Sequence, residues 1–153
     1  MFDRLVIVTA KEHARSAFPE ESCGLIVKDR YIPCSNSSEE LPDRFKISME
    51  EFVRVSKEHG SVLAVVHSHV NGPDYPSKLD MESQMAMNVP WGIIVVKPGY
   101  VAEPFWFGDG VPVPPLLERP FRWGVTDCYA LVRDWYRLNF GLRLPNFPRE
   151  DEW

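Results

Sequence analysis

Three nearly continuous apolar runs, CGLIV, SVLAVV and WGIIVV, most strongly limit how this chain can fold. Each run has the length of a β-strand, and none shows the strict polar and apolar alternation of a sheet with one face in water. We therefore expect strands covered by protein on both faces at residues 23–27, 61–66 and 91–96, with the middle strand ending at His67.

Helix start signals lie between these runs. Ser48 with Glu51 forms a capping box, and Gly60 suits the position just past a helix end, which predicts a helix over residues 49–59. Ser77 is the expected cap of a second helix, which begins in SKLDMESQMAM. The order of elements predicts an α/β sandwich with a mixed sheet flanked by helices, followed by a short C-terminal helical segment.

Four other segments carry local signals. RLVIV, residues 4–8, is predicted as a strand, and Thr9 with Glu12 as the capping box of a helix that stops before Pro19. NSSEELPDR, residues 36–44, is predicted as a polar loop. FWFGDGVPV, residues 105–113, is predicted as two short strands joined by a Gly-Asp-Gly turn. The proline-rich VPVPPLLERP, residues 111–120, is the one clear linker candidate.

Composition excludes several classes of protein. A length of 153 residues with 44% hydrophobic residues suits one packed core with a small appendage. No apolar run approaches the roughly 18 residues of a membrane span, and the start of the chain lacks a secretory signal, so a cytosolic location is expected. The mild net charge of -5 offers no footprint for nucleic acid. The three cysteines have no CxxC spacing, which predicts reduced thiols.

The stretch VVHSHVNGPDYPSKLDM, residues 65–81, holds the residues with the clearest chemistry. His67 and His69 stand two apart at a strand end, so their side chains leave the same face of the sheet. Asp80 follows one turn into the next helix. Two imidazoles and one carboxylate form a catalytic-type zinc set with a fourth position open to water. Zinc lowers the pKa of that water from about 15.7 to about 7, which makes hydroxide available near neutral pH.

The same residues allow a second interpretation. Ser77 and Asp80 match a capping box, which needs no metal, and the two histidines could be solvated or bonded to backbone carbonyls. Ordinary residue usage gives the full H-x-H-x7-S-x-x-D spacing on the order of once in several thousand chains of this length. The two interpretations are compatible, because a carboxylate at a helix start stays ionised and able to bind a cation.

Hydrolysis at a zinc site also needs a base, and Glu20 and Glu21 precede the strand in PEESCGLIV. This stretch, NSSEELPDRFKIS and HSHVNGPDYPSKLD together resemble the JAMM (MPN-type) zinc peptidases, whose pattern is a glutamate followed by H-[ST]-H-x7-S-x-x-D. The resemblance covers roughly residues 1–113. One departure is Val70, where family members often have proline after the second histidine.

The resemblance implies a JAMM/MPN-like, cytidine-deaminase-like fold and a protein or peptide substrate. It implies that Glu21, three residues before Gly24, is the general acid/base. It also implies that the Ser77 hydroxyl steadies the tetrahedral intermediate. The implied zinc ligands are His67, His69 and Asp80.

The tail, residues 121–153, resembles the opening of NlpC-type cysteine peptidase domains, in which Cys128 is the nucleophile. A thiol near a helix N-terminus is stabilised as thiolate. The alternative is an apolar helix with a buried cysteine and an aromatic stripe. All four histidines precede Cys128, so the base that such a nucleophile needs is missing. We therefore expect a first domain at residues 1–113, a linker at 114–120, and an incomplete second domain at 121–153 that continues in a longer parent chain.

The pairing of a JAMM domain with an NlpC-type segment resembles the tail assembly protein K family of long-tailed phages. It implies phage tail proteins as partners, and a location in the host cytoplasm or the virion tail. Three hypotheses follow. The leading one is a zinc-dependent peptidase or isopeptidase. The second is a structural tail-tip protein without protease activity, and the third is a cell-wall hydrolase that acts through Cys128 in the longer parent chain.

Overall fold

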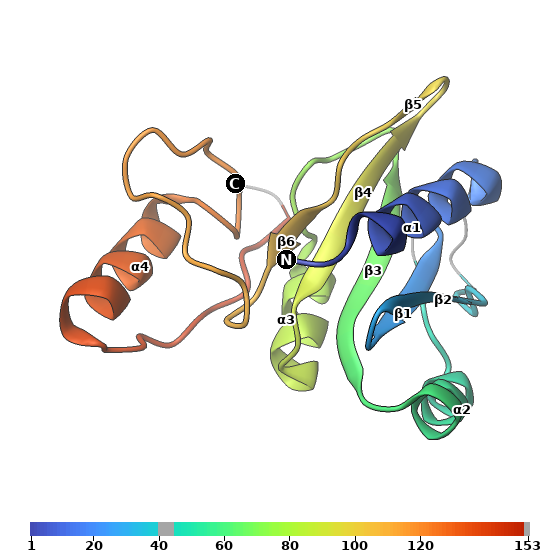
Figure 1. Cartoon of the computed structure of the whole chain (residues 1–153). Helices are drawn as coiled ribbons and strands as arrows, with labels where there is room; N and C mark the ends of the chain where they lie inside the picture. The colour runs from blue at the N-terminus through green and yellow to red at the C-terminus, as the bar shows by residue number, and fades with distance from the viewer. Residues whose placement is uncertain (40–44, 152–153) are drawn as a thin grey trace.

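The computed structural model describes residues 1–39 and 45–151 (Figure 1). Its elements in chain order are α1 (Arg4–Ala17), β1 (Cys23–Val27), β2 (Arg30–Cys34), α2 (Met49–His59), β3 (Val62–Val70), α3 (Lys78–Met87), β4 (Trp91–Lys97), β5 (Tyr100–Val101), β6 (Phe105–Phe107) and α4 (Cys128–Phe140). The strands of the described residues form one six-stranded mixed sheet of order β2-β1-β3-β4-β5, with β6 also paired to β4. The predicted α/β class is confirmed.

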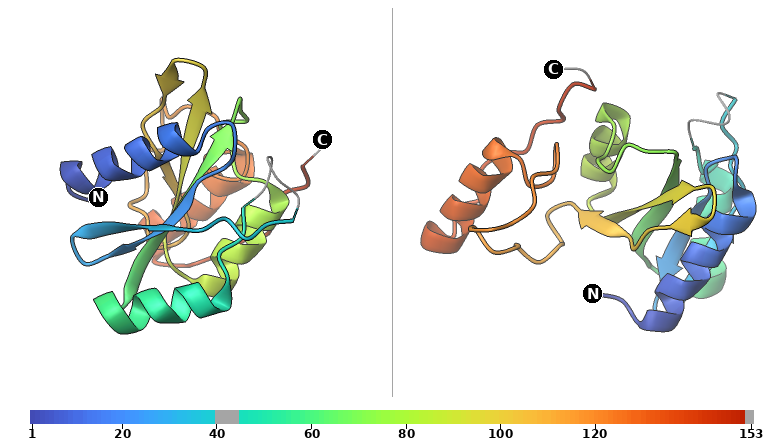
Figure 2. Two further views of the ribbon diagram at one scale, coloured as in Figure 1. Left: turned by 90° about the vertical axis from the view of Figure 1, so that its right-hand side faces the viewer. Right: turned by 90° about the horizontal axis from the view of Figure 1, so that it is seen from above.

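The sheet is covered on both faces (Figures 1 and 2). One core contains Val6, Ala10 and Ala14 of α1, and the other contains Val55 of α2 and Met81 of α3. The central strands β1, β3 and β4 are therefore buried on both faces, as their continuous apolar runs predict.

Strand β3 divides its side chains between these two cores. Ala64 and Val66 pack in the α1 core, whereas Val65 packs in the core with α3. Because side chains alternate along a strand, His67 and His69 point to the same side as Val65. Strand β3 runs parallel to β4, with α3 in the connection between them.

The predicted end of the middle strand at His67 is wrong, because β3 continues to Val70. His67 pairs with Ile93 and His69 with Val95 of β4, and Val70 still pairs with Val96. The histidines therefore lie within the last part of a hydrogen-bonded strand, which holds their backbone in place.

The strand predicted at residues 4–8 is also wrong, because these residues begin α1. The Asp3 side chain accepts a hydrogen bond from the Leu5 backbone N–H at 2.8 Å and caps the helix. Thr9 lies inside the helix and donates its hydroxyl to the Leu5 carbonyl, so it is not a cap. The buried residues recur every four positions, whereas Leu5 is 70% exposed, so only one helical face of this apolar run is covered.

Two further differences lie at the edges of the sheet. RYIPC forms edge strand β2, paired with β1, which the sequence analysis did not predict; Pro33 is tolerated there because an edge strand has one unpaired side. Of the two strands predicted in residues 105–113, only β6 forms. Pro112 and Pro114 follow it and lack the N–H that a second strand would need. Residues 40–44 of the predicted polar loop lie outside the described residues.

The tail packs beside α3 instead of joining the sheet (Figure 2). Residues 108–127 contain no helix or strand, and α4 begins after its cap, Asp127. Cys128 is the first residue of α4 and is exposed, so the alternative of a buried cysteine is wrong. Among the described residues, no helix combines the length and apolar character needed to cross a membrane.

Candidate metal centre

Two imidazole nitrogens and the two oxygens of one carboxylate converge between β3 and α3. Nε2 of His67 lies 3.1 Å from Nε2 of His69. Oδ1 of Asp80 lies 3.3 Å from the first nitrogen, and Oδ2 lies 3.4 Å from the second. Ligands at 2.0 to 2.2 Å from a tetrahedral zinc ion are separated from one another by about 3.3 to 3.6 Å. The three side chains are buried, and one potential ligand atom from each lies within 4.8 Å of the others, so they form a group that could hold one metal ion.

The contacts of the two histidine rings determine which ring nitrogens are available to bind a metal ion. Nδ1 of His69 lies 2.9 Å from the Pro73 carbonyl oxygen, which only accepts, so Nδ1 carries the proton and Nε2 keeps its lone pair. The ring of His67 stacks on Phe45 at 4.1 Å between centroids. Two imidazole nitrogens only 3.1 Å apart cannot both direct lone pairs at each other, so either an N–H hydrogen or a metal ion must lie between them. The donor set therefore fits a cation.

Asp80 serves the helix and the donor group together. Its Oδ2 accepts hydrogen bonds from the Ser77 backbone N–H at 2.8 Å and from the Ser77 hydroxyl at 2.7 Å. Ser77 Oγ also accepts from the Asp80 N–H at 3.1 Å, which completes the capping box. Oδ1 remains directed at His67. The capping interpretation is confirmed, and it leaves one carboxylate oxygen for a cation.

The surroundings of the two histidines shift their pKa values in opposite directions. Burial lowers the pKa of His67, and the nearby Asp80 offsets this only in part, so the ring is neutral as a ligand must be. Burial also acts to lower the pKa of His69, but Asp80, the Pro73 carbonyl and the charge of Glu21 raise it overall. Burial would raise the pKa of Asp80, yet the two histidines hold it well below its ordinary value. Asp80 is therefore a carboxylate.

Glu21 is buried just before β1. It lines a cavity of about 270 Å³, here called the metal pocket, together with His69, Ser77 and Asp80. Hydrogen bonds between Ser22 and Ser68 hold this segment against β3. The Ser22 N–H donates to Ser68 Oγ at 2.8 Å, and the Ser68 N–H donates to the Ser22 carbonyl at 3.0 Å. Exposed Glu20 instead lines a neighbouring cavity of about 370 Å³, which Glu21 also borders.

Two residues of this site were missed in the sequence analysis. Ser68, the central residue of the H-S-H motif, holds the Glu21 segment, and its place between the two histidines was the available signal. Phe45 covers the ring of His67, and nothing local in the sequence indicates that contact. Cys128 is not among the residues that line the metal pocket.

Two relatives from phages are similar to this chain in sequence. The chain is 34% identical over 145 residues to "Tail tip assembly protein K" of Escherichia phage N15, which covers 92% of this chain and 58% of the relative. It is 35% identical over 107 residues to the protein of the same name from Escherichia phage lambda, which covers 70% of this chain and 49% of the relative. The chain thus spans only about half the length of these relatives.

Two solved structures are similar in fold. A solution structure of a Desulfitobacterium hafniense protein has a TM-score of 0.56 and 24% identity, and covers 71% of this chain and 84% of its own. A solution structure of a Salinibacter ruber protein has a TM-score of 0.51 and 21% identity, and covers 83% of this chain and 99% of its own. At these sequence identities, the similarity shows only that this chain shares their fold.

The family model that describes prokaryotic homologs of the JAB domain matches residues 6–107. The match runs from α1 through β6 and includes every residue of the candidate metal centre. JAB/MPN domains include metallohydrolases, which agrees with the buried His-His-Asp group. The chain therefore belongs to the family of prokaryotic homologs of the JAB domain.

Proposed function

We propose that this protein is a zinc-dependent peptidase or isopeptidase that acts in the assembly of a phage tail tip. One observation carries the proposal: the potential ligand atoms of two buried histidines and one aspartate lie within 4.8 Å of one another, at a pocket that the carboxylate-bearing Glu21 also lines. Such a set suits metal-assisted amide hydrolysis, which needs three ligands, an open position and a base.

His67, His69 and Asp80 would hold the zinc ion, which supplies a water of lowered pKa and a Lewis acid for the substrate carbonyl. Glu21 would accept the proton of that water and pass it to the leaving amine. Ser77 would donate its hydroxyl to the oxygen on which negative charge develops. In the structure this hydroxyl donates to Asp80, so it would have to turn, while Asp80 keeps the bond from the Ser77 N–H.

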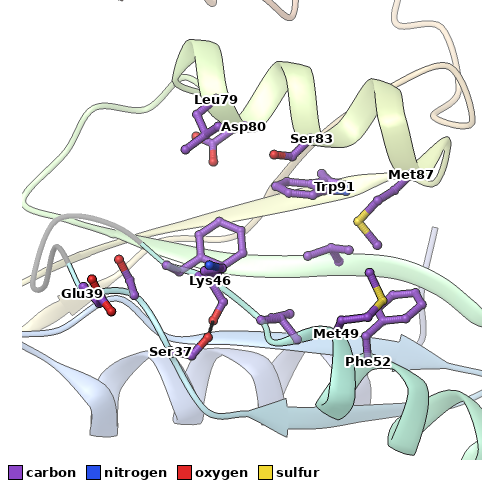
Figure 3. Close-up of a pocket in the computed structure, with 14 residues that line it drawn as sticks. Ser37, Glu39, Lys46, Met49, Phe52, Leu79, Asp80, Ser83, Met87 and Trp91 are labelled. Atoms are coloured by element: carbon purple, nitrogen blue, oxygen red, sulfur yellow. Dashed lines mark hydrogen bonds between the residues drawn. The ribbon is translucent and has the colours of Figure 1, made fainter.

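A large apolar cavity beside the metal pocket supports a polypeptide substrate (Figure 3). It measures about 840 Å³ and shares Phe45, Leu79 and Asp80 with the metal pocket. Val65 and Trp91 of the sheet also line it, and Met49, Phe52 and Met87 stand together at the end away from Asp80. A chain whose scissile bond lies at the metal could place large apolar side chains in this cavity.

The role in tail assembly is supported by the relatives, which are named as tail tip assembly proteins. Under this proposal, tail proteins are the substrates or partners, and the protein works in the host cytoplasm or on the virion tail. A structural role without hydrolysis is the second candidate, because Asp80 and Ser77 already serve to cap α3. Residues 1–113 are proposed as the peptidase domain, 114–120 as a linker, and 121–153 as the start of an NlpC-type domain around exposed Cys128.

Peptide-library cleavage tests the activity directly. The protein loaded with zinc is expected to cut members of a mixed peptide library, with large apolar residues enriched near the cut. A chelator should stop cleavage, and added zinc should restore it. The measurement is mass spectrometry of the new termini. Stoichiometric zinc with no new termini, either in the library or in isolated tail proteins, would reject the peptidase and favour the structural role.

Ser77→Ala separates the cap from the metal centre. It removes the cap of α3 and the hydroxyl bond to Asp80, so we expect a loss of about 1 kcal/mol in the free energy of unfolding. Loss of a group that orients a ligand should also weaken zinc binding by about 10- to 100-fold. Ser48→Ala is the matched control, because Ser48 caps α2 by accepting from the Glu51 N–H at 3.2 Å, in a helix that supplies no metal ligand. Urea unfolding and zinc titration measure both effects; equal zinc affinity in the two variants would exclude this role for Ser77.

A further inference from the structure

After α4 the chain runs back toward α3 (Figure 2). Residues 147–151, here called the strap, lie along the N-terminal end of α3. The Lys78 backbone N–H donates to Oδ1 of Asp151 at 2.6 Å, and the Lys78 ammonium pairs with Glu150 at 2.7 Å. Asp151 lines the metal pocket together with Glu21 and His69. The strap lies outside the matched family region, residues 6–107.

The strap is anchored at its base. The guanidinium of Arg149 forms two bonds with Asp127, at 2.8 and 3.1 Å, and Asp127 is the buried cap of α4. The Trp123 indole N–H donates to the Glu150 carbonyl at 2.9 Å, and the Arg149 N–H lies 3.4 Å from the sulfur of Met81 in α3. These contacts fix the strap to both α4 and α3.

The strength of the contacts differs along the strap. The forked Arg149 pair is largely buried, so it is the strong anchor. The Lys78–Glu150 pair is exposed and contributes little. Asp151 accepts from a first-turn amide of α3, one of the helix groups that have no partner within the helix. The end nearest the metal pocket is therefore held by this bond and by the Trp123 bond to the Glu150 carbonyl, and loss of its side-chain contacts should loosen it.

We infer that the strap forms one wall of the metal pocket and limits access to the metal from that side. The functional consequence of this inference rests on the proposed function, because it concerns how a substrate reaches the metal. Among the described residues, no strap residue lines the apolar cavity. The substrate would then be an extended polypeptide segment that reaches the metal along the cavity, passing between the strap and Phe45.

The test compares two double variants of the whole chain. Glu150→Ala/Asp151→Ala removes both strap contacts with Lys78. Glu12→Ala/Asp29→Ala removes the same charge from exposed positions that do not line the pocket. Hydrogen exchange at the Lys78 amide reports docking of the strap. Labelling of His69 by diethyl pyrocarbonate without metal reports access to the pocket, with His59 as internal standard.

The strap variant should raise exchange at the Lys78 amide by about fivefold or more, the factor that corresponds to one lost hydrogen bond. His69 labelling relative to His59 should rise by a similar factor, and the control variant should match the parent. Unchanged amide exchange would show that the strap does not dock. Faster exchange with unchanged His69 labelling would show that it docks without covering the pocket. Both readouts work without metal or hydrolysis, so they stand even if the peptidase proposal fails.

Discussion

Glu21→Gln is expected to remove zinc-dependent hydrolysis while leaving the fold and zinc binding intact. The amide keeps the shape of the carboxylate and much of its hydrogen bonding, but it cannot accept the proton of the metal-bound water. Loss of a general base of this kind lowers the rate by about a hundredfold to ten-thousandfold. Glu21 is not one of the three residues of the metal-binding group, so zinc content should remain near one per chain.

Glu20→Gln is the matched control, because Glu20 precedes Glu21 but is exposed and does not line the metal pocket. Cleavage rate and zinc content are measured for both variants. A wild-type cleavage rate in Glu21→Gln would show that Glu21 is not the general base. Tail assembly should be scored in parallel. Normal assembly with Glu21→Gln, together with no cleavage of any tail protein by the wild type, would support the structural role.

His67→Ala is expected to abolish stoichiometric zinc binding. The wild type should hold about one zinc ion per chain in a tetrahedral set of three ligands and water. Removal of one buried ligand leaves only two protein ligands in the group. Zinc should also stabilise the wild type against unfolding, by about 2.7 kcal/mol at a free concentration one hundred times the dissociation constant. The variant should lose this zinc-dependent part. Zinc content and unfolding with and without zinc measure both effects.

The control for this variant is His59→Ala, at the C-terminal end of α2 and outside the metal group. It should keep its zinc and its zinc-dependent stability. Because the His67 ring also stacks on Phe45, His67→Ala will lose some stability without metal, so the informative quantity is the change that zinc produces. Equal stabilisation by zinc in wild type and His67→Ala would place the metal elsewhere.

Local patterns predicted the central part of the fold. The helices at residues 49–59 and 78–87 have caps whose hydrogen bonds form between residues three apart, so the sequence contains both partners. The buried strands were recognisable because burial on both faces demands an unbroken apolar run. The metal group followed from the same logic. A spacing of two along a strand directs His67 and His69 to one face, and the helix start at Ser77 directs Asp80 back toward them.

Only the tertiary structure decided the rest, because those features depend on residues distant in the sequence. Residues 4–8 are composed like a strand, but Asp3 and the packing of one face against the sheet make them helical. Phe45 reaches His67 across 22 positions of sequence, and the strap reaches Lys78 across 73. The sequence by itself therefore determined which side chains form the candidate metal group. Long-range packing determined the walls of the pocket around them, because these walls come from segments whose local patterns contain no information about each other.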